Sequence, residues 1–312
     1  MIICFGEILL DTFVDKNTKK ETSFVGGAPF NVAYQAHMMS NNVLFVGNVG
    51  KDAAGKKIQK FFDEHDLDKR GLHVLSDKKT LISKVTLDHT ERSFTFEREN
   101  SADDCFEDDA LDHIQEGDLI HCGSFLLSTK KGRDYLDQIL QFTKSQNKIT
   151  SFDINYRKDI FADEKEAIDI YEKYYPSFDI VKFSKEELQL FTKEDDIEKG
   201  LKKLKKGPKL ILVTLGKDGS IAYYRDKTVK AKSIKVNCVD TTGAGDAFFG
   251  TFLSNVDSIG LREMLFIPSL MESTLKFSNI AGALATTKKG ALESIPSFKE
   301  VNKVLENNTF QK

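Results

Sequence analysis

The chain has 312 residues, with 45 lysines and arginines against 48 aspartates and glutamates, which gives a formal net charge of −3. This balance provides no basic surface field and therefore argues against nucleic acid and anionic membranes as partners. No stretch reaches the roughly 18 uninterrupted apolar residues that a membrane-spanning helix needs. The four cysteines lack C-x-x-C spacing, which is typical of reduced thiols rather than of zinc sites or disulfides. We therefore expect a cytoplasmic protein without a signal sequence or a membrane span.

Short apolar runs rich in β-branched residues alternate with longer amphipathic runs along most of the chain. Alternation of this kind predicts an α/β fold with a mostly parallel sheet that carries helices on both faces. Ligands of such sheets bind at the carboxyl ends of the strands, so the site is expected there. The predicted strands cover residues 2–8, 42–49, 118–125, 149–155, 179–184 and 209–216. The predicted helices cover residues 30–39, 54–65, 132–145, 186–191, 195–206, about 265–287 and 298–306.

Two segments interrupt this alternation, at about residues 12–25 and about residues 74–98. Both alternate polar and apolar residues, the pattern of strands with one solvated face, and neither contains a predicted helix. We expect them to form a small separate sheet inserted in a single domain of residues 1–312. That sheet would act as a lid over the site or as a dimerisation surface, since pairing two lids would cover an exposed apolar face.

The stretch VDTTGAGDAFFGTFL, residues 239–253, places Gly243, Ala244 and Gly245 directly before Asp246 and an apolar helix. Small residues let backbone N–H groups point into one concavity, and the N-terminus of the next helix adds positive potential. Such a turn binds an anion or a developing phosphoryl charge. The Asp246 carboxylate would either cap the helix or accept a proton from a substrate hydroxyl, and the pattern alone leaves both interpretations open.

Further candidates lie in a glycine-rich turn and at the ends of predicted strands. In VGGAPFNVA, residues 25–33, Gly26 and Gly27 allow a ligand to approach the backbone, and Asn31 offers both a donor and an acceptor. The same residues would equally form a turn that begins a helix. Polar groups lie at or just after the ends of the first and fourth predicted strands, at Asp11, Asp153, Asn155 and Arg157.

Several familiar motifs are incomplete or absent in the sequence. Residues 50–57 have the G-x-x-x-x-G-K spacing of a phosphate loop, but Lys57 stands where Ser or Thr would hold Mg²⁺, so a simple turn explains them better. No G-x-G-x-x-G follows the first strand, which removes the main support for a dinucleotide-dependent dehydrogenase. The six histidines show no metal-ligand spacing, and no G-x-S-x-G marks a serine hydrolase.

Taken together, GGAPFNVAYQAHMMSNNVLFVGNVG (residues 26–50) and DTTGAGDAFFGTFL (residues 240–253) resemble the paired signatures of the PfkB carbohydrate kinase family, the ribokinase and fructokinase type. The second departs only at Thr251, where Gly or Ala is usual. The resemblance covers nearly the whole chain and implies a ribokinase-like α/β/α core with a small β-sheet lid. It also implies an ATP-dependent sugar kinase, in which positioning and charge stabilisation provide most of the catalysis.

The resemblance implies a role for each part of the site. Asp246 would take the proton from the sugar hydroxyl, and Gly243, Ala244 and Gly245 would form the anion hole for the γ-phosphate. With the strand-end residues added, the candidate sugar-binding residues are Asp11, Gly26, Gly27, Asn31, Arg98, Ser124, Asp153 and Arg157. The candidate nucleotide-binding residues are Thr214, Gly216, Gly219, Asn279 and Ser184.

Two cations are also implied by the resemblance. The Mg²⁺-organising Asn-x-x-Glu of the family appears here with Ser184 in place of Asn and with Glu187 kept, and a hydroxyl can still bond a metal-bound water. A K⁺ ion would lie beside the anion hole. Its candidate residues are Asp240 and Thr242, with Ala285, Lys288, Gly290 and Ser294 opposite.

The choice of sugar rests on four stretches that resemble the fructokinase branch. These are GGAPFNVA, the strand end at Gly123 and Ser124, the lid strand that ends near Arg98, and FSNIAGALATTKKGALESIP (residues 277–296). D-Fructose is therefore the expected substrate. A kinase for 2-keto-3-deoxygluconate shares much of this pattern, and an arginine would suit its carboxylate. A non-catalytic sugar or nucleotide sensor on the same fold is the alternative from another class, although a sensor would not need Asp246.

Overall fold

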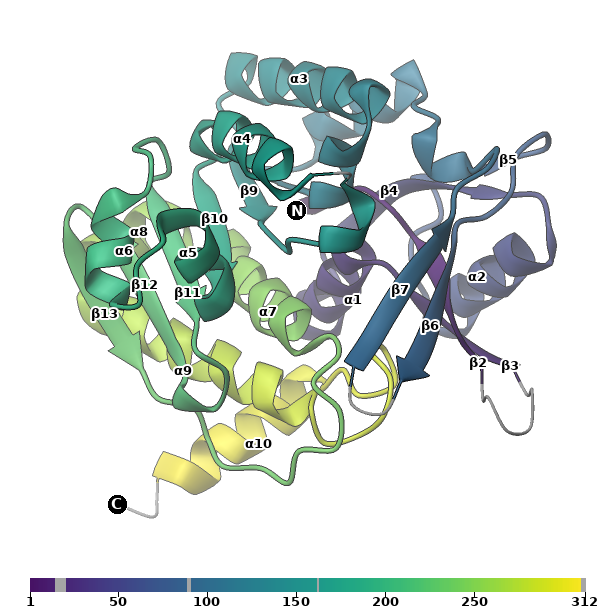
Figure 1. The fold of residues 1–312 in the computed structure, drawn as a ribbon. Helices are drawn as coiled ribbons and strands as arrows, with labels where there is room; N and C mark the ends of the chain where they lie inside the picture. Colours follow the sequence, from purple (N-terminus) through teal and green to yellow (C-terminus); the bar gives the residue numbers. More distant parts are fainter. Residues whose placement is uncertain (15–20, 89–90, 162, 310–312) are drawn as a thin grey trace.

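The computed structural model describes residues 1–14, 21–88, 91–161 and 163–309 (Figure 1). Its main sheet has nine strands in the order β13-β12-β11-β10-β9-β8-β1-β4-β5. All neighbours from β11 to β5 pair in parallel, and β12 and β13 extend the sheet as an antiparallel hairpin. These strands are β1 (Ile2–Phe5), β4 (Val43–Gly50), β5 (Leu72–Leu75), β8 (Leu119–Cys122), β9 (Ile149–Asp153), β10 (Ile180–Ser184), β11 (Leu210–Thr214), β12 (Ser220–Tyr224) and β13 (Lys227–Ala231). The predicted α/β class is confirmed.

Helices cover both faces of the main sheet, because successive residues of its strands point to opposite sides. In β1, Ile2 and Cys4 belong to the apolar core under α1, α2, α7, α8 and α9, whereas Ile3 and Phe5 belong to the core under α3 to α6. The helices are α1 (Ala28–Ser40), α2 (Ala53–Glu64), α3 (Lys130–Ser145), α4 (Glu164–Tyr174), α5 (Lys185–Thr192), α6 (Ile197–Lys203), α7 (Ala244–Ile259), α8 (Leu261–Phe266), α9 (Pro268–Leu284) and α10 (Phe298–Thr309). Within the described residues, no helix combines the length and the apolarity needed to cross a bilayer.

The structure differs from the sequence-based elements at two helices. No helix was predicted at α4, which begins where Asp163 accepts a hydrogen bond from the backbone N–H of Glu166. The helical region expected at about residues 265–287 is mostly α9, which begins at Pro268, and its first two residues are the end of α8 at Phe266. Proline suits the first turn of a helix but not its interior, because it has no N–H to donate.

A second sheet of four strands, in the order β3-β2-β6-β7, lies beside the main sheet (Figure 1). It contains β2 (Leu9–Val14), β3 (Glu21–Gly26), β6 (Ile82–Asp88) and β7 (Glu91–Glu97). The first segment of the small sheet was expected from about residue 12 but begins at Leu9. The second was expected from about residue 74 but begins at Ile82, because Leu72–Leu75 belongs to the main sheet as β5. Residues 15–20 and 89–90 of those segments lie outside the described residues. Whether this small sheet serves as a lid or as a dimer contact stays a prediction.

Two glycines at strand ends set the position of α1 against the main sheet. A Cβ on Gly6, after β1, would lie 2.5 Å from Pro29 Cγ, and a Cβ on Gly123, after β8, would lie 2.7 Å from the same atom. Only glycine therefore lets the first turn of α1 pack against both strand ends. The N-cap of α1 is Gly27, whose φ of 114° a side chain rarely adopts. This packing holds the next turn of α1, including Asn31, over the carboxyl edge of the sheet.

Candidate active site

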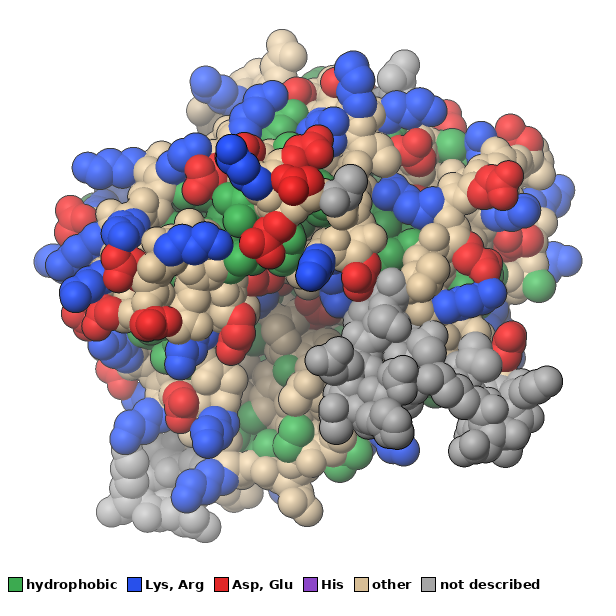
Figure 2. Space-filling view, viewed as in Figure 1, with side chains coloured by type: hydrophobic (Ala, Val, Ile, Leu, Met, Phe, Trp, Pro, Cys, Tyr) green, Lys and Arg blue, Asp and Glu red, His purple; other side chains and the backbone are tan. Residues whose placement is uncertain are grey.

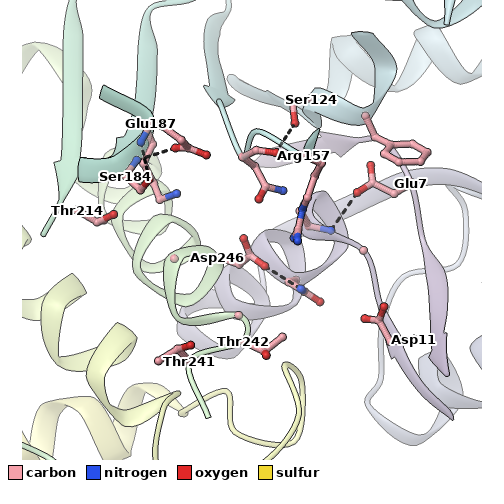
Figure 3. A pocket seen from close by; sticks show the side chains of 18 of the residues that line it. Glu7, Asp11, Ser124, Arg157, Ser184, Glu187, Thr214, Thr241, Thr242 and Asp246 are labelled. Atoms are coloured by element: carbon pink, nitrogen blue, oxygen red, sulfur yellow. Dashed lines mark hydrogen bonds between the residues drawn. The ribbon is translucent and has the colours of Figure 1, made fainter. Parts of the chain in front are cut away.

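A polar cavity of about 450 Å³ lies at the carboxyl ends of the parallel strands, between the main sheet and the small sheet. The space-filling view shows this face hollowed near its centre (Figure 2). In the close view, Asp246 lies between Ser184, Glu187 and Thr214 on one side and Arg157, Glu7 and Asp11 on the other (Figure 3). The site therefore has two halves that meet at Asp246.

The turn before α7 brings Gly243 and Gly245 to the cavity, whereas the Ala244 N–H donates to the Thr241 carbonyl oxygen at 3.3 Å. Gly243 is the N-cap with a left-handed φ of 78°, and no side chain caps the helix. The first N–H groups of a helix have no partner within it, and with the helix dipole they form a ready site for an anion. Gly243 and Gly245 line the cavity, whereas Ala244 is not among its lining residues. This geometry suits a phosphate group.

Asp246 lies in the first turn of α7, and its Oδ2 accepts a hydrogen bond from Asn31 Nδ2 at 2.8 Å. Asn31 belongs to α1, so the carboxylate is held from a second helix. Burial, followed by the negative charge of Asp153, raises the pKa of Asp246 to about 6, while Asn31, Lys182 and Arg157 act in the opposite direction. A carboxylate with a pKa near neutrality is well suited to accept a proton.

Close packing of α1 on α7 allows this hydrogen bond. A Cβ on Gly250, one turn after Asp246, would lie 2.5 Å from the carbonyl oxygen of Val32. Glycine at this position therefore lets the two helix backbones approach each other. The next residue, Thr251, is fully buried, and its hydroxyl has no hydrogen-bond partner among the described residues.

The structure brings most of the candidate sugar-binding residues together. Gly26 lies directly behind one of them, because a Cβ on it would be 2.6 Å from Asp11 Oδ2. The candidates that line the cavity are Asp11, Gly27, Asn31, Ser124 and Arg157.

Arg98 and Asp153 are not among the residues that line the cavity. The Arg98 guanidinium donates to Asp103 Oδ2 at 2.7 Å and to Ser128 Oγ at 2.8 Å, and it lies 4.3 Å from the centre of the Phe125 ring. Phe125 itself lines the cavity, so Arg98 supports this wall from behind. Asp153 is buried in an ion pair with Lys182. Neither side chain lines the cavity, so the direct sugar contact that the sequence suggested for them stays a prediction.

On the opposite side, three of the candidate nucleotide-binding residues line the cavity: Ser184, Thr214 and Gly216. Gly219 instead forms the turn between β11 and β12, where a Cβ would collide with the carbonyl oxygen of Ala231. Asn279 is buried on α9, and its Nδ2 donates to that same carbonyl oxygen at 3.1 Å. Gly219 and Asn279 therefore hold the end of the hairpin in place and are not lining residues.

Ser184 and Glu187 form a reciprocal capping box at the start of α5. Glu187 Oε2 accepts from the Ser184 backbone N–H at 2.7 Å, and its Oε1 accepts from that of Tyr156 at 2.7 Å. Burial and Asp153 raise the pKa of Glu187 above its ordinary value, although Lys182 opposes this shift. Each carboxylate oxygen keeps a lone pair that can bond a metal-bound water. Since Mg²⁺ usually keeps several waters and binds through substrate phosphates, these two residues fit an Mg²⁺ ion.

The candidate K⁺ residues lie on two loops that are bonded to each other. Asp240 Oδ2 accepts from the Gly290 N–H at 3.3 Å, and its Oδ1 accepts from Thr242 Oγ1 at 2.8 Å. The Ser294 hydroxyl donates to the Gly290 carbonyl oxygen at 2.7 Å. Ala285 is buried near this loop, whereas Lys288 is exposed. Carboxylate, hydroxyl and carbonyl oxygens are the ligands of hard cations, so the loop pair fits a K⁺ ion in chemistry.

Sequence reasoning missed several residues that line the cavity. Glu7 is only 8% exposed, its Oε1 accepts from the Ala28 N–H at 3.1 Å, and its Oε2 has no partner among the described residues. Burial raises the pKa of Glu7 to about 8. Lys182 is a second buried charged residue that lines the cavity and was not predicted. The available signal was a charged residue inside or directly after an apolar strand. The cavity residues that were not predicted include Glu7, Ser83, Lys182, Glu186 and Thr241.

Comparison with known proteins identifies the fold and the family. The model of the pfkB family carbohydrate kinases matches residues 1–297. Fructokinase-1 of Zea mays is 34% identical over 319 residues, covering 98% of each chain. The structure of a fructokinase with bound ATP from Xylella fastidiosa matches with a TM-score of 0.90 at 28% identity, over 99% of this chain and 98% of that one. A double mutant of the Vibrio cholerae fructokinase, bound to fructose, ADP and a potassium ion, matches with a TM-score of 0.84 at 28% identity, over 97% of each chain.

The fold is thus a ribokinase-like α/β fold, with a mostly parallel sheet and a small second sheet. The chain belongs to the PfkB family and is an ATP-dependent carbohydrate kinase. The family resemblance seen in the sequence motifs is confirmed.

Proposed function

We propose that the protein phosphorylates a hydroxymethyl group of D-fructose with ATP, and that Asp246 is the base. The observation that carries this proposal is the position of Asp246. It lies beside an uncapped helix N-terminus and is held by Asn31 at 2.8 Å inside the cavity. Fructose is supported by the similarity to fructokinases over nearly the whole chain.

In the proposed step, the sugar hydroxyl oxygen attacks the γ-phosphorus of ATP while Asp246 accepts the hydroxyl proton. The bond between the γ-phosphorus and the bridging oxygen breaks, and ADP leaves. N–H groups of the turn from Gly243 to Gly245 stabilise the charge on the transferred phosphoryl group. Bound Mg²⁺ would neutralise charge on the phosphates, with Glu187 and Ser184 holding its waters.

The division of the cavity supports this arrangement. The nucleotide would occupy the half with Ser184, Thr214 and Gly216, and the sugar would occupy the half with Asp11 and Arg157. Asp246 lies where the two halves meet, so one carboxylate is available to both reacting groups.

ADP release with Mg·ATP and K⁺ tests the proposal across D-fructose, 2-keto-3-deoxygluconate, ribose, adenosine and fructose 6-phosphate. We expect rapid turnover with D-fructose. Faster turnover with another member would keep the chemistry and correct the sugar. ATP binding without ADP release on any of them would instead favour a non-catalytic sensor.

The variant Asp246→Asn is the matched control, because it keeps the shape of the side chain and its contact with Asn31. It should fold normally and lose roughly 10²–10⁴-fold in kcat, the usual contribution of a positioned base. Circular dichroism checks the fold and steady-state kinetics check the rate. An Asn variant with a kcat near that of the wild type would exclude Asp246 as the base.

A further inference from the structure

We propose that Lys182 is a positioning residue whose buried ammonium group supplies positive potential beneath the anion-binding turn and offsets the negative charge around Asp246. This inference rests on the proposed function. The residue itself was not predicted from the sequence.

The position of the ammonium group carries the argument. Lys182 lies in β10, its side chain is 6% exposed, and it still lines the cavity. Its Nζ donates to Asp153 Oδ2 at 2.6 Å. A Cβ on Gly245 would lie 3.3 Å from the same nitrogen, and the Phe249 ring centre lies 5.9 Å away. The ammonium group is therefore enclosed between Asp153 and the first turn of α7.

The charges that face Asp246 come from several elements. Asp153 on β9 adds negative charge, while Arg157 after β9 and Lys182 on β10 add positive charge. From α1, Asn31 provides a neutral hydrogen bond. Burial alone would lower the pKa of Lys182, but Asp153, Glu187 and Asp246 raise it above the ordinary value, so the amine keeps its charge.

A contribution to the stability of the fold does not explain the ion pair between Lys182 and Asp153. The neighbours of Lys182 in β10 are Ile180, Val181 and Phe183, all fully buried. Replacing a buried ion pair with apolar side chains of similar volume is often neutral or stabilising, because both charges must leave water. A lysine in this strand is better explained by what its charge does at the cavity.

Four variants separate the electrostatic role from a structural one: Lys182→Met, Lys182→Arg, Asp153→Asn and the double variant Lys182→Met with Asp153→Asn. We expect Lys182→Met to move the acid limb of kcat/KM to higher pH and to lower kcat about tenfold, less than the loss of a direct anion-hole donor. Asp153→Asn should move the limb to lower pH. The double variant should return the acid limb of kcat/KM to its wild-type pH but keep the low kcat. Lys182→Arg, which keeps the positive charge, should show a kcat and an acid limb close to those of the wild type.

Unchanged kcat and acid limb in a folded Lys182→Met variant would overturn the inference. If that variant fails to fold, the double variant decides, because it leaves no unpaired charge; wild-type kcat in it would likewise overturn the inference. The pKa of Asp246 can also be followed without turnover by carboxylate ¹³C NMR, with Asp246→Asn to assign the signal. An inactive wild type would contradict the proposed function, and the NMR shift would still test Lys182.

Discussion

At the scale of single residues, the site depends on polar groups that are only partly satisfied. Asn31 and Asp246 are 215 positions apart and meet in one hydrogen bond. Glu7 presents an oxygen without a partner among the described residues to the same cavity. Burial raises the pKa values of Asp246 and Glu7. Protonation of Asp246 is therefore expected to change activity, and protonation of Glu7 is expected to change stability.

The pH dependence of activity follows from Asp246. Its pKa is raised to about 6, so the base is protonated below that pH and ionised above it. We expect kcat/KM to fall on the acid side with a midpoint near pH 6, and Asn31→Ala to move this midpoint upward by removing a hydrogen bond to the ionised form. Steady-state kinetics from pH 5 to 8 measures both. A midpoint near that of an ordinary aspartate would contradict the assignment.

The pH dependence of stability follows from Glu7. Its pKa rises from an ordinary 4.5 to about 8, so the folded state holds this proton more tightly than the unfolded state. The wild type therefore loses stability between these pH values, and Glu7→Gln, which keeps an acceptor for Ala28, should not. We expect Glu7→Gln to raise Tm by a few degrees at pH 9 relative to the wild type.

At pH 4, where Glu7 is protonated in both states, that difference in Tm should disappear. Glu64→Gln on the exposed surface of α2 is the matched control. Its ion pair with Lys60 is exposed and contributes little to stability, so it should leave Tm nearly unchanged at both pH values. An equal effect of the Glu7 variant at both pH values would mean that packing, not ionisation, is responsible.

At the scale of elements, the crossing of α1 and α7 sets the geometry of the base. Gly250 lies where the two backbones meet, and the adjacent Thr251 has a buried hydroxyl without a partner among the described residues. Substitutions at these two neighbouring positions of α7 are therefore expected to change the stability of the fold in opposite directions. At one of them an added methyl group has no space, and at the other a polar atom is unsatisfied.

Gly250→Ala should lower the free energy of unfolding by about 1–3 kcal/mol, as overpacking usually does, and should also lower kcat by moving Asn31 from Asp246. Thr251→Val, the matched control, removes a hydroxyl without a clash and should be neutral or stabilising by about 1 kcal/mol. Urea denaturation and ADP release measure the two effects. Wild-type activity in a destabilised Gly250→Ala variant would separate the helix crossing from the geometry of the base.

The sequence predicted the elements and motifs more fully than the contacts of individual side chains. Alternating apolar runs predicted the sheet and its layers, because the apolar pattern of a strand or a helix depends only on residues that are close together in the sequence. The turn before Asp246 was predicted because its glycines are adjacent in sequence. Arg98, Asn279 and Lys182 show what could not be predicted. Their side chains bond to groups that only the folded chain brings near. The resemblance of the lid strand therefore placed Arg98 at the sugar, and no sequence pattern pointed to Lys182.

At the scale of the whole molecule, we predict that two copies associate through the small sheet. Phe13 and Phe24 pack edge to face on this sheet, with ring centres 5.8 Å apart, and both are partly exposed. Partly exposed aromatic rings on a sheet are apolar surface that a partner would cover. We expect a homodimer joined through this sheet, with twice the chain mass of 35.2 kDa.

Light scattering at micromolar protein measures this mass directly. Phe13→Ser with Phe24→Ser should shift the protein toward the monomer without changing the main sheet. A monomeric wild type would contradict the dimer, and a variant that remains dimeric would place the contact elsewhere.

One of the connections between the two sheets, from β1 to β2, is only three residues long. Gly6, Glu7 and Ile8 join the end of β1 to the start of β2. Asp11 belongs to β2 and Glu7 to the connection, whereas Asp246 is fixed to the helices of the main sheet. Any rotation of the small sheet about this connection therefore changes the distance from Asp11 to Asp246. If the small sheet is the predicted lid, we expect a ligand that bonds to both Asp11 and Asp246 to draw the lid toward the main sheet as it binds, so that lid closure would depend on ligand binding.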